Sequence, residues 1–585
     1  MASGIGEARA HAFGQRYDLP LPLDLYLAGA AAAVVLSFVV MAVAFRERPR
    51  QSEAPWADLA GPKARSGRLH RAVTGTLKAA AVGLFLLVVA AGFLGNQETV
   101  KNFAPTFVWI IWWVGFAYLA ALVGNPWPVL NPFSILFSWA EWAWARAAPG
   151  RRFGLDLPYP EPLGAWPAVL LFVGFAWFEL LSPAATSPAV LALAIVAYGA
   201  LTWFGMFAFG HRIWLVHGEA FARAFDVFGR FAPLGGPALD DPASGDGRPH
   251  LYLRPYAGAL VADRPARLSV TAFVVLMLST VTFDGFKETP LWGALLQGTA
   301  ASPTLHPAIR GIHDLGFDLQ SVLETALFVL FPLVFFIVYL GFAGLTRRWA
   351  GDDRPLTEIA GLFVYSLVPI AIAYHLAHYL SYLVLAGQLI IPLASDPFGW
   401  GWDLFGTAGH RIRIDLIGAK FVWYAAVISI VAGHVIAVGV GHFTALRAFP
   451  SPLAARRSQY PMLVLMVGYT VASLWILSQP IVGGGDVGTL RAARDTVTLA
   501  PFEFRERCYA LRAGETLAYD FSADRPVDFD IHYHDGLRTH APVALSGATN
   551  RGGRFRAASN RTYCLMWANR NLAPASVSYR IQGPR

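Results

Sequence analysis

The chain has 585 residues, of which 55% are hydrophobic and 14% are charged, whereas about 25% are charged in an ordinary soluble domain. This composition excludes a soluble globular enzyme and, with repeated apolar runs of about 20 residues, places the chain among polytopic membrane proteins. The formal net charge of +8 is not a nucleic-acid signal in such a chain, because Lys and Arg gather in cytoplasmic loops of membrane proteins.

Ten apolar stretches are long enough to cross about 30 Å of hydrocarbon as helices. They begin near Asp24, Arg71, Ala104, Leu163, Ser187, Arg267, Asp318, Pro355, Asp415 and Gln459. Alternate connecting loops hold 23 Lys and Arg residues on one side and five on the other. The positive-inside rule therefore predicts a multi-pass protein of the bacterial inner membrane with both termini outside, in the periplasm. We predict an exterior segment over 1–23 and an all-α transmembrane domain over 24–482.

Two segments on the predicted inner side have the composition of interfacial helices. Asn125-Pro126-Trp127-Pro128 and Asn131-Pro132 interrupt helix geometry, and a Trp-rich run to Arg146 follows. From His211 to Phe231, aromatic side chains recur at helical spacing opposite arginines. We predict that this second segment also lies on the inner membrane surface.

From Gly483 onward, short alternating runs replace the long apolar ones, which predicts a C-terminal exterior β-sandwich over 483–585. The expected strands are Thr516–Phe521, Val527–Tyr533, Thr562–Trp567 and Ser576–Ile581. Cys508 and Cys564, the two cysteines of the chain, both lie in this domain, and an exterior location favours a disulfide over two free thiols. Four residues alternate along one strand and share a face, either as a metal site or as a solvated surface: Asp528, Asp530, His532 and His534.

The chain contains no Walker A loop, no His-Glu-x-x-His and no Gly-x-Ser-x-Gly motif. The remaining guide to chemistry is that ionisable side chains inside membrane spans are costly and therefore need a reason. The residues that meet this description are Glu179, Asp284, Glu324, His375, His378, Lys420, His434 and His442, with Lys78 near the inner surface.

Glu324 and the pair His375 and His378 fall at similar depth near the outer face, because their helices run in opposite directions. The two histidines are three residues apart and share one helical face, and Pro369 loosens the backbone just before them. Imidazole and carboxylate together are the ligands that Zn²⁺, Mn²⁺ or Fe²⁺ prefer. We predict a divalent metal site.

The predicted metal ligands are His375, His378, Glu324 and His313, with His434 included if the long helices tilt, and Glu324 and Asp284 are the predicted catalytic carboxylates. Three alternatives remain: a hydrogen-bonding network that only joins helices, with Glu324 paired to Lys420; a transport path; and a haem held between His434 and either His375 or His378.

The N-terminal run from His11 through Asp18-Leu19-Pro20-Leu21-Pro22 to Gly29 resembles the start of the integral-membrane fenitrothion-hydrolase-like proteins of bacteria. The turns Gly124-Asn125-Pro126-Trp127 and Leu130-Asn131-Pro132 are similar to theirs as well. The resemblance covers the membrane part, to about residue 480, and carries over no catalytic residues. It implies hydrolysis of organophosphorus triesters.

A neutral, lipophilic triester would partition into the bilayer, and a metal-bound water could attack its phosphorus. The sequence therefore leads us to expect a metal-dependent hydrolase of phosphotriester-like substrates with its site near the outer face. His11 and Asp18 could approach the mouth of that site or form an ordered strap. The rival expectations are a transporter, a subunit that recruits a protein partner through the exterior domain, and a metal- or haem-handling protein.

Overall fold

The computed structural model describes residues 23–45, 57–58, 68–236, 239, 251–261, 264–302, 304–315, 319–410, 412–413, 416–479, 493–499, 504–535, 538–569, 571 and 574–582. Within these residues, ten helical segments are long and apolar enough to cross a membrane. Eight are formed mainly by one helix each: α1 (Leu23–Ala44), α3 (Arg68–Leu94), α8 (Trp166–Leu181), α9 (Pro188–Phe209), α12 (Leu268–Lys287), α15 (Leu319–Ala350), α19 (Ala419–Ala448) and α20 (Pro452–Ser478). The other two segments are broken helices. The predicted number and positions of the long apolar helices are confirmed.

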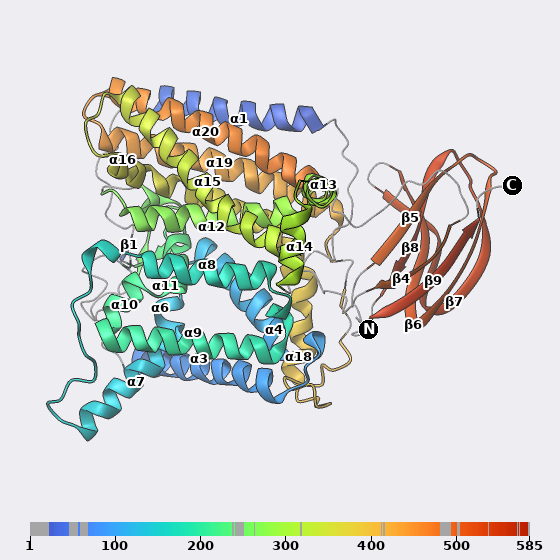
Figure 1. Ribbon diagram of the computed structural model, residues 1–585, viewed down its shortest axis with the longest axis horizontal. Coiled ribbons are helices and arrows are strands. Elements are labelled where there is room, and N and C mark those ends of the chain that lie inside the picture. Colours follow the sequence, from blue (N-terminus) through green and yellow to red (C-terminus); the bar gives the residue numbers. More distant parts are fainter. Residues whose placement is uncertain are drawn as a thin grey trace.

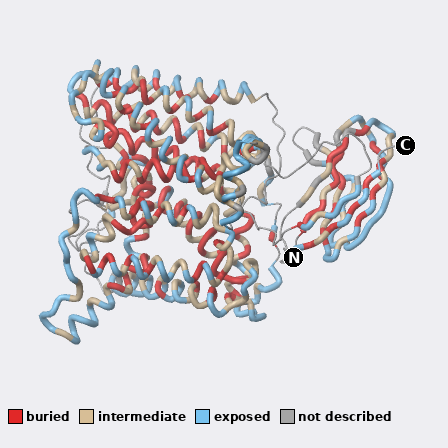
Figure 2. The backbone as a smooth tube through the Cα atoms, viewed as in Figure 1, coloured by how far each residue is buried: buried red, intermediate tan, exposed pale blue. Residues whose placement is uncertain are grey.

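The helices lie roughly side by side and the C-terminal sheet follows α20 (Figure 1). Buried residues concentrate on the helices at the middle of the bundle, and exposed positions line its outer helices (Figure 2). On α15 the exposed side chains include Leu330, Leu333 and Ile337, with Ile337 67% exposed. Apolar side chains that face outward are what a lipid-facing helix requires.

Both broken spans pass through the centre. The third span consists of α4 (Phe103–Pro105), a π-helix η2 (Thr106–Gly115) and α5 (Phe116–Leu122). The eighth consists of α16 (Leu356–Phe363), the 3₁₀ turn η7 (Val364–Leu367), α17 (Val368–Leu385), a second 3₁₀ turn η8 (Ala386–Leu389) and α18 (Ile390–Ser395). The predicted loosening before the histidines is confirmed, because the 3₁₀ turn η7 ends two residues before Pro369. The π-helix was not predicted, and such segments are frequent at functional sites.

The segment from His211 to Phe231 divides near Gly218: the residues before it are partly exposed, whereas nearly all of those from Ala220 to Gly229 are buried, so the predicted surface location is wrong for the second part. It forms α10 (His211–His217), which packs back along α9, and α11 (Ala220–Gly229), in which nine of ten residues are buried. The ring of Phe221 is 4.9 Å from that of Phe175, in the middle of α8. Helix α11 therefore re-enters the bundle. The helical spacing of its aromatic residues, which suggested an interfacial helix, belongs to a helix that is packed on several sides.

The tip of this re-entrant segment is held by the buried carboxylate of Glu219. It accepts hydrogen bonds from Trp127 Nε1 at 3.0 Å, from Asn131 Nδ2 at 3.2 Å and from the Tyr198 hydroxyl at 2.6 Å. The backbone N–H groups of Phe221 and Ala222 also donate to it, so Glu219 caps the N-terminus of α11. One carboxylate thus joins α9, α11 and the Asn-Pro turns.

Trp214 of α10 lies against two glycines. A Cβ atom added at Gly205 would come 2.1 Å from the Trp214 ring, and one at Gly218 would come 2.4 Å from it. We expect Gly205→Ala to lower the unfolding free energy by about 1–3 kcal/mol, because the indole has to move out of a packed interior. Thermal unfolding in detergent measures this, with Gly174→Ala as the control, since no atom lies within 4 Å of its added Cβ. Equal losses of stability in both variants would contradict the prediction.

The connecting segments form short elements. The Trp-rich run is helical, as α6 (Trp127–Leu130) and α7 (Pro132–Ala147), and α7 exposes Trp142, against whose ring Arg146 packs at 3.5 Å. Strands β1 (Ala57–Asp58), β2 (Leu234–Gly235) and β3 (Tyr252–Leu253) form a small sheet. The remaining helices are η1 (Thr99–Lys101), η3 (Glu161–Leu163), η4 (Pro183–Thr186), η6 (Gly258–Leu260), α13 (Pro290–Ala301) and α14 (His306–Asp314).

The C-terminal domain is one antiparallel sheet of six strands, bent into a half-barrel, and not the predicted sandwich of two sheets. Its strands are β4 (Ala493–Leu499), β5 (Phe504–Leu511), β6 (Thr516–Asp535), β7 (Arg538–Arg556), β8 (Arg561–Ala568) and β9 (Ala575–Gln582). The long strand β6 covers two of the predicted strands. It pairs with β9 in its first half and with β8 in its second half, so it joins into one sheet the strands that were expected to form two. The predicted disulfide between Cys508 and Cys564 is confirmed.

Candidate functional site

A charged cluster lies near the end of the bundle at which α12 and α20 terminate. Asp284, three residues before the end of α12, is 1% exposed. Its Oδ2 atom lies 2.7 Å from His378 Nε2 and accepts a hydrogen bond from the Tyr379 hydroxyl at 3.4 Å. Its other oxygen lies 3.5 Å from Lys287 Nζ, one turn further along α12. An imidazole and an ammonium group therefore share one buried carboxylate.

Glu179 of α8 completes this cluster. It lies within electrostatic range of Asp284 and Lys287. Lys287 Nζ also donates to the backbone carbonyl of Leu180 at 2.8 Å, which ties α12 to α8. We call Glu179, Asp284, Lys287, His378 and Tyr379 the Asp284 cluster. Its two carboxylates exceed its one ammonium by one charge, so a proton on His378 or on a carboxyl group makes it neutral.

His375 lies one turn before His378 on α17, and within the described residues neither of its ring nitrogens has a hydrogen-bond partner. It is 3% exposed. Aromatic rings surround it, with the Tyr379 ring at 4.8 Å, Tyr118 at 5.5 Å, Phe228 at 5.9 Å and Trp113 at 6.0 Å. Buried polar atoms without partners are rare in proteins and often mark functional groups.

A second polar layer lies deeper, between α12, α19 and α20. Thr282 and Tyr469 are hydrogen-bonded through their hydroxyl groups. The Tyr469 ring is 5.8 Å from that of His434, whose Nδ1 donates to the carbonyl of Ile430 at 2.8 Å. His434 is fully buried. The hydrogen bond of His434 Nδ1 is therefore made within its own helix.

The structure brings together some of the predicted site residues. Asp284 and His378 are in contact, and His375 is within electrostatic range of His378. Glu324, by contrast, accepts a hydrogen bond from Gln320 of its own helix at 2.8 Å. Among the described residues, no group of three or more His, Cys, Asp and Glu side chains could hold a metal ion. The His313 side chain lies outside the described part, and the metal centre remains a prediction.

The other polar residues singled out in the sequence have separate surroundings. Lys420 lies 5.9 Å from the ring of Tyr424, and His442 is bonded to Gln459 and to the carbonyl of Phe45. His11 and Asp18 lie outside the described residues. On the C-terminal sheet, Asp530 contacts His532 while Asp528 accepts from the backbone N–H of Gly547. The His534 side chain lies outside the described part as well.

Two members of the Asp284 cluster were not predicted: Lys287 and Tyr379. Lys287 follows Asp284 by three residues, which is the spacing of neighbours on one helical face, so this pair could have been recognised. Tyr379 directly follows a predicted residue, but its hydrogen bond to Asp284 joins two helices that are distant in sequence.

No family model matches this chain, and no curated protein matches it. Among solved structures, it is similar to the crystal structure of Aeromonas hydrophila PliG, a periplasmic lysozyme inhibitor of g-type lysozyme. The match has 14% sequence identity and a TM-score of 0.13, and covers 16% of this chain and 88% of that chain.

Proposed function

We propose that the chain is an inner-membrane hydrolase of lipophilic phosphotriester-like substrates, with its termini in the periplasm and the Asp284 cluster as its site. The observation that carries this proposal is the 2.7 Å contact between Asp284 and His378 inside a bundle of apolar helices. A carboxylate that orients an imidazole is the arrangement by which proteins make a general base. The resemblance to fenitrothion-hydrolase-like proteins supplies the substrate class.

In this proposal His378 removes a proton from water while Asp284 holds the ring and balances its positive charge. The water oxygen attacks phosphorus and the bond from phosphorus to the leaving oxygen breaks. The departing phenolate or alkoxide then takes the proton from the His378 imidazolium and leaves as a phenol or an alcohol. Lys287 stabilises the negative charge that develops on the phosphoryl oxygen. The side chains of His378 and Lys287 are 15% and 18% exposed, so both have access to a substrate that arrives from the bilayer.

The described residues do not fit a divalent metal ion, since they form no group of three ligands. We therefore assign no step to a metal.

A second candidate function is proton-coupled transport, or proton conduction within a larger complex. The observation that favours it is the deeper polar layer of Thr282, Tyr469 and His434, to which hydrolysis near the membrane surface gives no role. Ionisable groups at successive depths are typical of proton paths in transporters.

We expect the purified full-length chain in lipid nanodiscs to release nitrophenol from a neutral nitrophenyl phosphotriester, and to keep that activity after chelation of divalent metals. Absorbance of nitrophenol and elemental analysis measure the two outcomes. A stoichiometric metal that is lost together with activity in His375→Ala would establish the predicted metal centre instead. Absence of hydrolysis, with proton movement in liposomes that His434→Phe abolishes, would establish the second candidate.

A further inference from the structure

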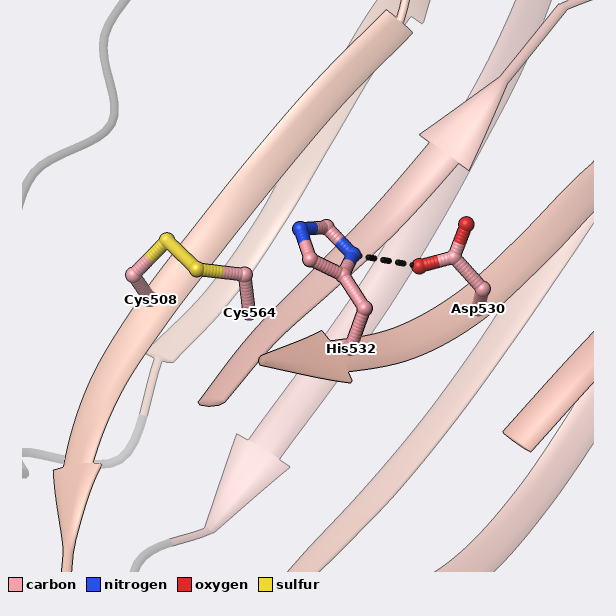
Figure 3. The surroundings of a disulfide bond; sticks show 4 residues. All are labelled: Cys508, Asp530, His532 and Cys564. Atoms are coloured by element: carbon pink, nitrogen blue, oxygen red, sulfur yellow. Dashed lines mark hydrogen bonds and ion pairs between the residues drawn. A yellow bond between two sulfur atoms is a disulfide. The ribbon is translucent and has the colours of Figure 1, made fainter. Parts of the chain in front are cut away.

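The disulfide of the C-terminal domain lies beside a histidine on the same face of the sheet. Cys508 of β5 and Cys564 of β8 are direct partners in the antiparallel register, and His532 of β6 is the direct partner of Cys564 on its other side. Residues directly opposite one another on neighbouring strands present their side chains on one face. The imidazole and the disulfide are therefore neighbours (Figure 3).

Asp530 fixes the orientation of this imidazole. It lies two residues before His532 on the same face of β6, and its Oδ1 atom is 2.6 Å from His532 Nδ1. With Nδ1 engaged by the carboxylate, Nε2 is the nitrogen directed to the side of the disulfide (Figure 3). His532 is 5% exposed. A carboxylate, an imidazole and a sulfur atom in this order form the set that activates thiols in proteins.

The position of the two sulfurs gives each a different role. In the described sheet β5 is the last strand, so Cys508 lies toward the edge and Cys564 lies between it and His532. Strands β5 and β8 are already paired by register from Phe504 to Leu511, so the disulfide joins strands that the backbone holds together. A crosslink at this place adds no strand pairing that the backbone hydrogen bonds do not already provide.

We propose that Cys508–Cys564 is a thiol–disulfide exchange site that accepts two electrons from a dithiol reductant, with His532 as the acid for the leaving sulfur. A thiolate of the reductant attacks Cys508 Sγ and the disulfide bond breaks. Cys564 leaves as a thiolate and takes a proton from the His532 imidazolium. The second thiol of the reductant then attacks the reductant's first sulfur, which is bonded to Cys508 in the mixed disulfide. Cys508 leaves and takes the proton of the attacking thiol. The reductant is now an oxidised disulfide, and both cysteines are thiols.

The rate of reduction by dithiothreitol tests the proposal in the full-length protein in detergent. After quenching, a maleimide–polyethylene glycol reagent labels the free thiols and shifts the chain on a denaturing gel. We expect His532→Gln to lower the rate constant by about tenfold or more at pH 6–7 and by less at pH 8.5, because an acid that protonates the leaving sulfur matters less as the pH rises. Asp530→Asn is expected to have a smaller effect in the same direction.

Asp528→Asn is the matched control, because Asp528 lies on the same face of β6 and its carboxylate accepts a hydrogen bond from the backbone N–H of Gly547. It should leave the rate and its pH profile unchanged. Equal rates for wild type and His532→Gln across this pH range would overturn the role of His532. Thiols that appear only after the domain is unfolded by denaturant would overturn the exchange site itself. Neither result bears on the proposed hydrolase, since the test does not involve the Asp284 cluster.

Discussion

Asp284→Asn is expected to lower kcat for phosphotriester hydrolysis by about 10²–10⁴-fold, the range that a general acid–base group typically contributes. The amide keeps the size of the carboxylate but removes the negative charge that His378 and Lys287 share at 2.7 and 3.5 Å. Without that charge the imidazolium formed during proton removal is not stabilised, and the ring loses its fixed tautomer. Nitrophenol release, measured at saturating substrate, gives kcat directly.

Two further variants make this result specific. His378→Gln is expected to reduce kcat to the same level as Asp284→Asn, and the double variant should be no slower, because the two residues act as a unit. Glu98→Gln is the control, since this exposed glutamate pairs with Lys101 in a connecting segment. A wild-type rate in Asp284→Asn, with the protein folded as judged by gel filtration, would remove the cluster from the catalytic mechanism.

The number and sequence positions of the long helices could be predicted because they depend on one physical requirement, the satisfaction of backbone polar groups in lipid. Each predicted start, such as Arg267 or Pro355, lies within a few residues of an observed helix. The re-entrant helix α11 could not be distinguished from an interfacial helix, because both place aromatic side chains at helical spacing. Its burial depends on contacts from α5 and α8 that are distant in sequence. In the C-terminal domain, β7 was not predicted because its Gly, Ser and Asn residues are typical of turns.

The candidate site likewise combines features that the sequence predicts with features that depend on tertiary packing. Asp284 and His378 could be selected as costly ionisable groups near the outer face, but the depth estimate matched His378 with Glu324 and placed Asp284 above them. The rotation of the helices about their axes determines where the other predicted residues lie. Glu324 bonds to Gln320 along its own helix, and His434 packs on Tyr469. Periodicity does not determine how one helix is rotated against another, because that angle follows from side-chain packing. Depth therefore selects candidates for a membrane site, and only packing assembles them.

The re-entrant helix α11 is hydrogen-bonded to its neighbours through one residue at its N-terminus, Glu219. The Asn-Pro turns, which carry part of the family resemblance, donate to its carboxylate through Trp127 and Asn131. Tyr198 donates from the middle of α9, and two backbone N–H groups donate from α11. All five donors lose their acceptor when this side chain is removed, and each unsatisfied buried donor costs about 1–3 kcal/mol. Relaxation of the tip recovers part of that sum.

We therefore expect Glu219→Ala to lower the unfolding free energy by about 3–5 kcal/mol, the range found when one partner of a buried charged network is deleted. The loss is measured by thermal or denaturant unfolding in detergent. Glu219→Gln should lose less, because its amide oxygen still accepts from the α11 backbone while its NH₂ group opposes the Trp127 and Asn131 donors. Glu161→Ala, at an exposed glutamate of η3, controls for loss of a carboxylate alone. A Glu219→Ala protein as stable as this control would show that the re-entrant helix is held by its aromatic packing, with the hydrogen bonds contributing little.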